Sequence, residues 1–193
     1  MSKSKILNYS QLGTLFKQME YLRHSQRDRL VIALTFYTGM RIGEITKLIW
    51  SDLIDSNLLP HTQINFKRDQ VKSRKPQRVL LSKKVRAEIT RYLKYYLSKH
   101  EKVNFARPVI LTQRNKAFTP NSLCIHINAV YKKVNQPHLT THSGRKSFIT
   151  ALANKAVNAK VIMTLARHEH LSSTQKYVEI NDEQLEQANE LIG

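Results

Sequence analysis

The sequence predicts a mostly α-helical protein with a small antiparallel β-sheet inserted after the third helix, an α+β fold. Apolar residues recur at intervals of three and four along most of the chain, which is helical spacing. Between residues 61 and 81 that pattern gives way to two short alternating segments around a basic turn. The 193 residues favour one compact domain, and an apolar content of 41% is enough for a core.

Three helices are expected before the sheet. Residues 9–23 carry apolar positions at helical spacing, with Ser10 as the predicted N-cap. Residues 27–38 are apolar nearly all round, which predicts a central helix, and Gly39 is expected to end it. A shorter third helix is expected over residues 43–49.

The rest of the chain returns to helical spacing after one β-hairpin. Residues 51–61 contain loop-forming residues, residues 61–66 and 77–81 read as paired strands, and residues 108–112 as a short further strand. The remaining expected helices cover residues 83–98, 119–134, 143–156, 158–167, 172–179 and 182–191. We expect one catalytic domain over residues 1–181 and a helical tail over residues 182–193.

The charge points to a polyanionic partner. Lys and Arg total 32 against 14 Asp and Glu, a formal net charge of +18. Such an excess attracts nucleic acid through the electrostatic field and counterion release, and an anionic membrane surface is the second candidate. Ribosomal proteins carry similar charge, so charge alone does not identify an enzyme.

Cysteine content and apolar runs restrict the class further. The single cysteine, Cys124, excludes a disulfide within the chain and a Cys-based zinc site, and its apolar helical setting predicts a buried thiol. No apolar run has the length of a membrane span or of a signal-peptide core. We therefore expect a cytoplasmic protein, associated with the nucleoid when bound to DNA.

The first candidate segment for chemistry is Thr38 to Glu44. Arg41 follows a glycine turn at the start of a helix, where a guanidinium can bind a phosphate in bidentate fashion. The alternative is a surface arginine paired with Glu44 three residues later. The second segment is the basic turn between the strands, whose cations suit a DNA backbone. One of them could protonate a leaving oxygen, and the local context does not choose among Lys72, Arg74 and Lys75.

Two further segments lie near the end of the chain. His142 and Arg145 are three residues apart, so on a helix they share one face and can meet the same phosphate; a plain helix start is the alternative. His168 and Tyr177 are nine residues apart, on two expected helices joined by a polar turn. Tyr177 is a candidate for chemistry, and the alternative is a half-buried aromatic side chain. The His168 and His170 pair is a poor metal site because its spacing is not the helical spacing of four found in zinc proteases.

Taken together and in this order, the segments resemble the catalytic domain of the tyrosine recombinase (phage integrase) family, in a short single-domain form. The likeness covers about residues 8–181, and Thr141 to Thr150 and Ser173 to Tyr177 are close to the family in form. The matches to the family's catalytic residues are Arg41, Lys72, His142, Arg145, His168 and Tyr177. Lys72 is matched by a Lys-Ser-x-Lys-Pro likeness to the family's Lys-Thr-Gly-Lys-Pro.

The resemblance implies a site-specific recombinase that cleaves and rejoins DNA through a 3′-phosphotyrosine. Arg41 and Arg145 suit the nonbridging phosphate oxygens, where charge builds during transesterification. Tyr177 would be the nucleophile, His142 the base, Lys72 the acid, and His168 a phosphate ligand. Further DNA contacts are expected from Lys67, Arg68, Arg74, Lys75, Arg78, Lys146 and Arg167. No metal or cofactor is implied.

Two departures from the family are visible. The family glycine before the second histidine is Arg167 here, which makes a backbone-permissive position bulky and cationic. From its 193 residues we also expect no N-terminal helical domain of the kind that most relatives use to clamp DNA. Relatives act as homo-oligomers, here expected to be a tetramer, and use a tail such as residues 182–193 to dock on a neighbour. Packing of the tail on its own core is equally compatible with the pattern.

Other functions remain open on sequence alone. A catalytically silent DNA-binding regulator with the same fold would keep the basic surface and lose the chemistry. A type IB topoisomerase-like enzyme would keep the chemistry without strand exchange. A basic RNA-associated structural protein would account for the charge but not for four ordered segments.

Overall fold

The computed structural model describes residues 5–67, 77–177 and 190. Its helices and strands are α1 (Tyr9–Met19), α2 (Ser25–Thr38), α3 (Ile42–Ile45), α4 (Trp50–Leu53), β1 (Gln63–Phe66), β2 (Gln77–Leu80), α5 (Lys83–Leu97), α6 (Pro120–Lys133), α7 (Thr141–Ala153), α8 (Ala159–Ala166) and α9 (Ser172–Gln175). The expected fold class, mostly helical with a small inserted antiparallel sheet, is confirmed.

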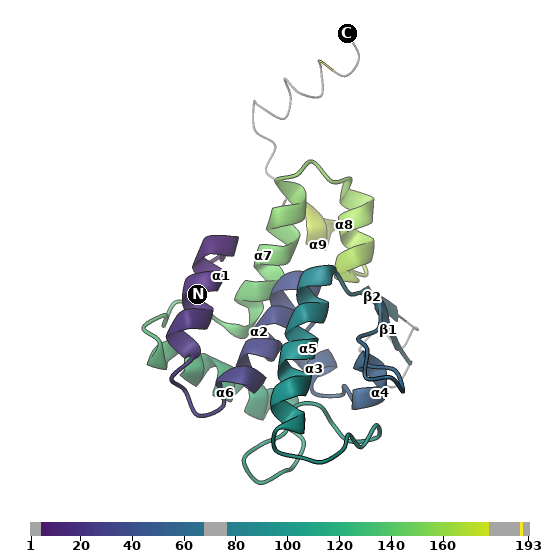
Figure 1. Cartoon of the computed structure of the whole chain (residues 1–193). Helices are drawn as coiled ribbons and strands as arrows, with labels where there is room; N and C mark the ends of the chain where they lie inside the picture. Colours follow the sequence, from purple (N-terminus) through teal and green to yellow (C-terminus); the bar gives the residue numbers. More distant parts are fainter. Residues whose placement is uncertain (1–4, 68–76, 178–189, 191–193) are drawn as a thin grey trace.

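Helix α2 is the centre of the molecule, as its apolar sequence predicts. It packs mainly against α5 on one side and α7 on the other (Figure 1). Every position from Leu30 to Phe36 is buried, so the helix has no solvent face along this stretch. Gly39 ends it in the left-handed conformation, with φ of 64°. The residues that follow α2 are therefore fixed against the core.

The close packing of α7 on α2 depends on a glycine. A Cβ added to Gly144 would lie 2.9 Å from the Cβ of Thr35 and 3.1 Å from the backbone nitrogen of Phe36. Both distances are shorter than ordinary contacts, so only a residue without a side chain allows this approach. Gly144 thus sets how closely α7 lies against the C-terminal half of α2.

The small sheet and its surroundings differ in detail from the expectation. Strands β1 and β2 pair antiparallel, from Gln63 opposite Leu80 to Phe66 opposite Gln77. The short helix α4 begins where a loop was predicted, because Trp50 is fully buried and stacks on Tyr92. The predicted strand over residues 108–112 is reduced to isolated bridges, one of them between Ile49 and Pro108.

Helix boundaries shift where capping residues lie. Asn8, rather than Ser10, is the N-cap of α1, because its side chain accepts a hydrogen bond from the backbone of Gln11 at 2.8 Å. Helix α3 ends at Ile45, earlier than expected, while Thr119 caps α6 as predicted. The predicted helix over residues 182–191 and the tail over 182–193 lie outside the described residues, apart from Glu190.

Buried apolar side chains form a main core and a small satellite. The main core joins α1 to α6 around α2. The satellite comprises Ile149, Ala153, Ile162 and Ala166, with Tyr177 packed against it. In Figure 1 this part, α8 and α9 beside the C-terminal half of α7, lies at one end of the molecule. Within residues 5–67 and 77–177, no helix has the length and apolarity to cross a membrane.

We predict that Gly144→Ala destabilises the fold. Overpacking of this kind costs about 1–3 kcal/mol, since the new methyl group meets backbone and a buried side chain. Chemical denaturation of the variant and the wild type measures the loss.

The matched control is Gly13→Ala in α1, where an added Cβ meets nothing within 4 Å. That change should be neutral or stabilising by about 0.5–1 kcal/mol, because alanine loses less chain entropy in a helix. Equal stability of the two variants would contradict the role assigned to Gly144.

Candidate active site

Four separated segments meet at one open cavity of about 540 Å³. It lies where the starts of α3, α6 and α7 approach α9. Five of the six predicted catalytic residues line it: Arg41, His142, Arg145, His168 and Tyr177. The sixth, Lys72, lies outside the described residues. The turn after α2, the helix α7 and the segment around α9 therefore supply one shared site.

Arg41, the N-cap of α3, is held in place by Glu44. Its backbone N–H donates to Glu44 Oε2 at 2.9 Å, and its Nη1 donates to Glu44 Oε1 at 3.1 Å. A further bond runs from Nη2 to the carbonyl of Arg167 at 3.3 Å. The side chain remains 39% exposed. Arg41 is thus paired with Glu44 and also lines the cavity. The pairing with Glu44 orients its guanidinium toward the cavity.

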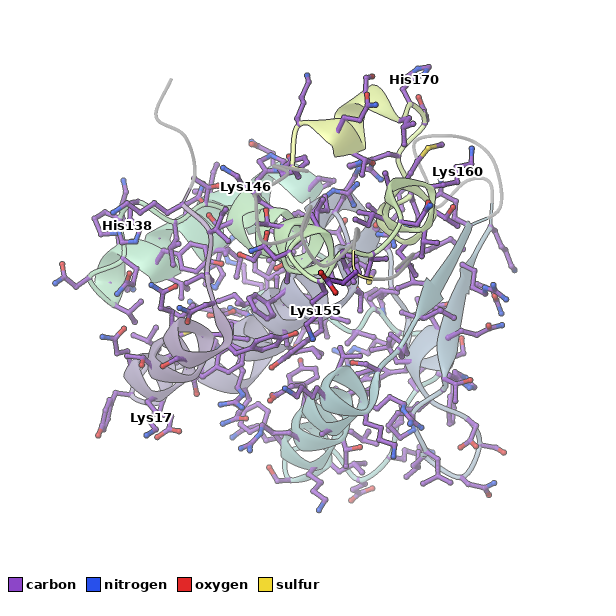
Figure 2. All side chains as sticks on the ribbon, turned by 90° about the horizontal axis from the view of Figure 1, so that it is seen from above. Lys17, His138, Lys146, Lys155, Lys160 and His170 are labelled. Atoms are coloured by element: carbon purple, nitrogen blue, oxygen red, sulfur yellow. The ribbon has the colours of Figure 1, made fainter. Side chains whose placement is uncertain are left out.

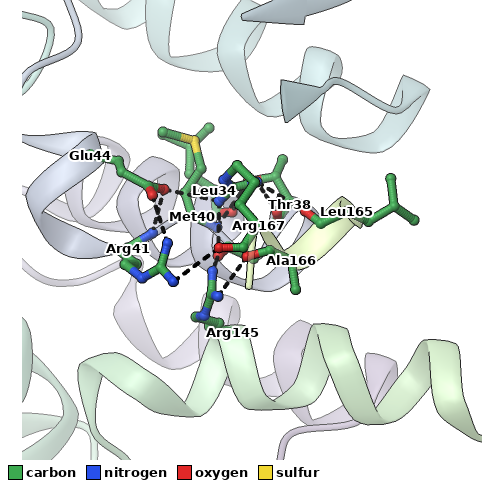
Figure 3. Close-up of polar contacts among 10 residues, drawn as sticks. Leu34, Thr38, Met40, Arg41, Glu44, Arg145, Leu165, Ala166 and Arg167 are labelled. Carbon is green, nitrogen blue, oxygen red and sulfur yellow. Dashed lines mark hydrogen bonds and ion pairs between the residues drawn. The ribbon is translucent and has the colours of Figure 1, made fainter. Parts of the chain in front are cut away.

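Arg145 is buried and points at two backbone carbonyls. One Nη donates to the carbonyl of Gly39 and the other to the carbonyl of Ala166 at 2.6 Å (Figure 3). Burial and the nearby charges of Arg41 and Arg167 lower the pKa of Arg145 below its ordinary value. A guanidinium has five N–H donors, so donors remain for an anion in the cavity. An anion there would relieve the unfavourable burial of charge.

Arg167 lies inside the protein. Its side chain is 3% exposed and its Nη2 donates to Glu44 Oε2 at 2.9 Å. Further bonds reach the carbonyls of Gly39 at 3.2 Å and Leu165 at 3.0 Å. The sequence predicted a DNA contact for this residue. The guanidinium is buried and its Nη1 and Nη2 donate to internal acceptors, which argues against that contact.

The carboxylate of Glu44 balances part of this charge. Burial alone would raise its pKa, but the charge of Arg167 and the hydrogen bond from the Arg41 backbone outweigh burial and lower it. Glu44 is therefore ionised at neutral pH and buried to 4% exposure. Three guanidiniums around one carboxylate leave the site strongly positive, which suits a phosphodiester.

His168 is half-buried beside these cations. Its Nδ1 lies 2.8 Å from the hydroxyl of Thr174. Burial, followed by the charges of Arg145, Arg41 and Arg167, lowers its pKa to about 4. A neutral imidazole can accept from Thr174 at Nδ1 and keep Nε2–H for a ligand. His142, in contrast, is exposed at the cavity wall, at the start of α7.

Tyr177 combines both interpretations that its sequence context allowed. Its ring is half-buried and packs on the satellite cluster, beside Phe148, Leu152 and Val157. It also lines the cavity and raises the pKa of Arg145, though burial and two cations dominate that pKa. The packing fixes the ring, and Tyr177 lines the same cavity as Arg41 and Arg145.

The other predicted DNA contacts are scattered. Lys67 directly follows β1 and Arg78 lies in β2 opposite Asn65, and both are exposed, while Lys146 is partly buried on α7. Arg68, Arg74 and Lys75 lie outside the described residues. Among the residues that are described, no three His, Cys, Asp or Glu side chains gather as a metal site.

Sequence reasoning missed two supporting residues. Glu44 was considered only as a rival partner of Arg41, although its spacing of three is the signal for the contact observed. Thr174, fully buried against His168, stood in the Ser-Thr-Gln-Lys-Tyr stretch without a role. Cys124 also lines the cavity, and it is half-buried with Sγ 3.6 Å from the Thr141 hydroxyl.

The fold is that of tyrosine recombinase catalytic domains. The chain belongs to the phage integrase family, whose pattern matches residues 5–184. It is 28% identical over 162 residues to the tyrosine recombinase XerD of Chlamydia muridarum, covering 83% of this chain and 51% of that protein. It is 26% identical over 181 residues to the tyrosine recombinase XerA of Pyrococcus horikoshii, covering 90% and 58%.

Solved structures agree on the fold. A crystal structure of XerA recombinase superposes with a TM-score of 0.70 at 23% identity, covering 95% of this chain and 63% of that one. The Tn1549 transposon integrase in complex with circular intermediate DNA gives 0.75 at 18% identity, covering 100% and 68%. The chain thus spans about half the length of the curated relatives it matches.

We predict that His168 makes stability sensitive to mild acid. Its folded-state pKa of about 4 lies below the ordinary 6.5, so the unfolded chain takes up the proton first as pH falls. The stability that neutral His168 contributes is present above pH 6.5 and is lost between 6.5 and about 4. His168→Gln should therefore lose less melting temperature than the wild type between about pH 7 and about pH 5.

The control is His138→Gln, which changes an exposed histidine away from the cavity. It should follow the wild-type pH dependence. If His168→Gln also followed it, the imidazole would not be held neutral by its surroundings.

Proposed function

We propose that the chain is the catalytic part of a site-specific DNA recombinase or integrase, which cleaves and rejoins strands through a 3′-phosphotyrosine intermediate. The observation that carries the proposal is the single cavity lined by Arg41, His142, Arg145, His168 and Tyr177. Membership of the phage integrase family supports the same activity. A binding module would not need a tyrosine on the same cavity as two arginines and two histidines.

The arginines stabilise the charge that develops on phosphorus. In the proposed reaction Arg41 and Arg145 bind the two nonbridging oxygens, and the Nε2–H of His168 donates to the same group. Both guanidiniums are already positioned, Arg41 by Glu44 and Arg145 by the carbonyls of Gly39 and Ala166. Preorganised donors of this kind require no rearrangement when the substrate binds.

The tyrosine supplies the nucleophile. Its hydroxyl oxygen attacks the phosphorus, the bond from phosphorus to the 5′-oxygen breaks, and the 3′-phosphate becomes joined to Tyr177. His142, exposed at the cavity wall, accepts the phenolic proton, and Lys72 gives a proton to the departing 5′-oxygen. Reversal with a new 5′-hydroxyl rejoins a strand, and the phosphotyrosine ester conserves the bond energy.

Charge supports double-stranded DNA as the partner. With a net charge of +18, cations also lie away from the cavity. Exposed lysines that Figure 2 labels include Lys17, Lys155 and Lys160, which lie at separate places on the molecule. The structure of the Tn1549 integrase was solved in complex with DNA.

We further propose that the chain forms a homo-oligomer, a tetramer, on DNA and that it acts in the cytoplasm, where the DNA lies. The prediction that residues 182–193 dock on a neighbour stays open, with packing in the same chain as its alternative.

We predict that Tyr177→Phe binds DNA like the wild type and forms no covalent adduct. The ring stays, so its packing on the satellite cluster survives and only the nucleophilic oxygen is lost. The substrate is a nicked duplex carrying the inverted repeats or attachment site that flank the gene, and denaturing electrophoresis detects the adduct.

The matched control is Tyr21→Phe, because Tyr21 is 93% exposed and remote from the cavity. It should form adduct at the wild-type rate. Adduct from Tyr177→Phe would overturn the nucleophile assignment, and no adduct from the wild type would favour a DNA-binding regulator. Relaxation of a supercoiled plasmid without recombination would favour a topoisomerase.

We also predict that a sulfur substrate bypasses Lys72. As general acid, Lys72 protonates a 5′-oxygen that otherwise leaves as a poor alkoxide, so Lys72→Ala should slow cleavage about 100- to 10,000-fold. A substrate with sulfur at the 5′-bridging position has a far better leaving group, since a thiol has a pKa near 8.5. Cleavage of that substrate by Lys72→Ala should be largely restored.

Two controls separate the roles. Arg145→Ala should not be restored to the same degree, because its target oxygens are unchanged. Lys75→Ala should lose only binding. Rescue of the Lys75 variant alone would transfer the acid role to Lys75, and rescue of neither would leave Lys72 as a phosphate contact.

A further inference from the structure

Arg167 occupies a backbone position that normally favours glycine. Its φ of 55° and ψ of 47° are left-handed, and it is the C-cap of α8. A non-glycine residue is strained there, so a bulky side chain persists only where its contacts compensate. The aligned family position is the glycine before the second histidine, as described above. The contacts of the Arg167 guanidinium are the ones that can compensate for this strain.

The guanidinium joins two turns that are far apart in the sequence. It donates to Glu44 Oε2 at 2.9 Å and to the carbonyls of Thr38 at 3.4 Å and Gly39 at 3.2 Å, all around the end of α2. Its own carbonyl accepts from Arg41 Nη2 at 3.3 Å. Figure 3 shows these contacts converging on the turn that carries Arg41. Arg167 therefore touches both groups that orient the catalytic arginines, Glu44 for Arg41 and Gly39 for Arg145.

Within residues 5–67 and 77–177, the segment that carries Tyr177 is anchored by one small apolar cluster and by polar bonds from arginines. Helices α8 and α9 lead to Tyr177, and their apolar packing is the small satellite cluster on α7. Polar bonds join this segment to the turn after α2. They come from Arg167 itself, from Arg41 to the Arg167 carbonyl, and from Arg145 to the Ala166 carbonyl.

We propose that Arg167 is a positioning residue for strand cleavage, which docks the segment carrying His168 and Tyr177 onto the turn carrying Arg41. It acts through Glu44 and the Gly39 carbonyl and does not touch the DNA. The inference rests on the proposed recombinase function and adds a residue that this chain has where the family has glycine.

The electrostatics support the same role. His168 is faced by Arg145 from α7, by Arg41 and Arg167 from the two turns, and by Thr174 from α9. The exposed neighbours Glu169 and His170 belong to its own turn. The positive charge of Arg167 helps keep His168 neutral, although burial is the larger cause of its low pKa. Removing that charge should raise the His168 pKa.

The test uses the full chain with Arg167→Met, Arg167→Gly and Arg167→Lys. Methionine keeps apolar bulk, glycine relieves the left-handed strain, and lysine keeps charge without the forked donors. The charge-matched control is Arg114→Met, at an exposed loop arginine remote from the cavity. Melting temperature, affinity for the nicked duplex, the single-turnover rate of adduct formation, and the His168 pKa from NMR are measured.

We expect the methionine and glycine variants to form adduct about 100-fold more slowly, the loss typical of misplaced catalytic groups. Their DNA affinity should match that of Arg114→Met, and the lysine variant should recover part of the rate. The His168 pKa should rise in the methionine and glycine variants and stay unchanged in Arg114→Met.

Two results would overturn the proposal. One is a folded glycine or methionine variant with the wild-type adduct rate; the glycine variant keeps this test valid if methionine fails to fold. The other is an unchanged His168 pKa in such a variant. If the wild type itself forms no adduct, the recombinase function fails, and the His168 titration still decides whether Arg167 is coupled to the site.

Discussion

The carbonyl of Gly39 accepts hydrogen bonds from two guanidiniums, those of Arg145 and Arg167, and the arrangement of the site depends on it. The left-handed turn exposes this oxygen at the end of the central helix. One acceptor shared by two cations, with Glu44 beside it, holds like charges close together in a buried place. Such a cluster of like charges is electrostatically unfavourable by itself and is stabilised by an anion, which fits the phosphate proposed as its ligand.

The central helix supplies the rigidity that this turn needs. Helix α2 is enclosed by α5 and α7, and the ion pair between Arg29 and Glu88, at 2.7 Å, joins it to α5. Gly144 allows α7 to pack closely against the same helix. Arg145, the next residue, therefore reaches the Gly39 carbonyl. Packing around α2 thus determines distances in the cavity, and a small shift of α7 would move the guanidinium of Arg145.

The sequence pattern correctly predicted the features that depend only on residues close together in the chain. The α2 helix, its glycine end, the hairpin and the shared face of His142 and Arg145 follow from spacing and turn chemistry. The destination of a long side chain does not follow in this way. Arg167 read as a surface cation because nothing near it in sequence reveals Glu44, 123 residues away, as its partner. Helix α4 was missed for the same reason, since Trp50 is buried by Tyr92 and Tyr96 from another helix.

The satellite cluster has a consequence for dynamics. Free energies of local opening scale with buried apolar contact, and Ile149, Ala153, Ile162 and Ala166 bury far less than the main core. Helices α8 and α9 should therefore exchange their amide hydrogens through partial opening, well before global unfolding. Tyr177, the proposed nucleophile, then belongs to a cooperative unit that opens separately from the main core. In the proposed reaction, the arginines can then stay fixed while Tyr177 engages and withdraws on its own timescale.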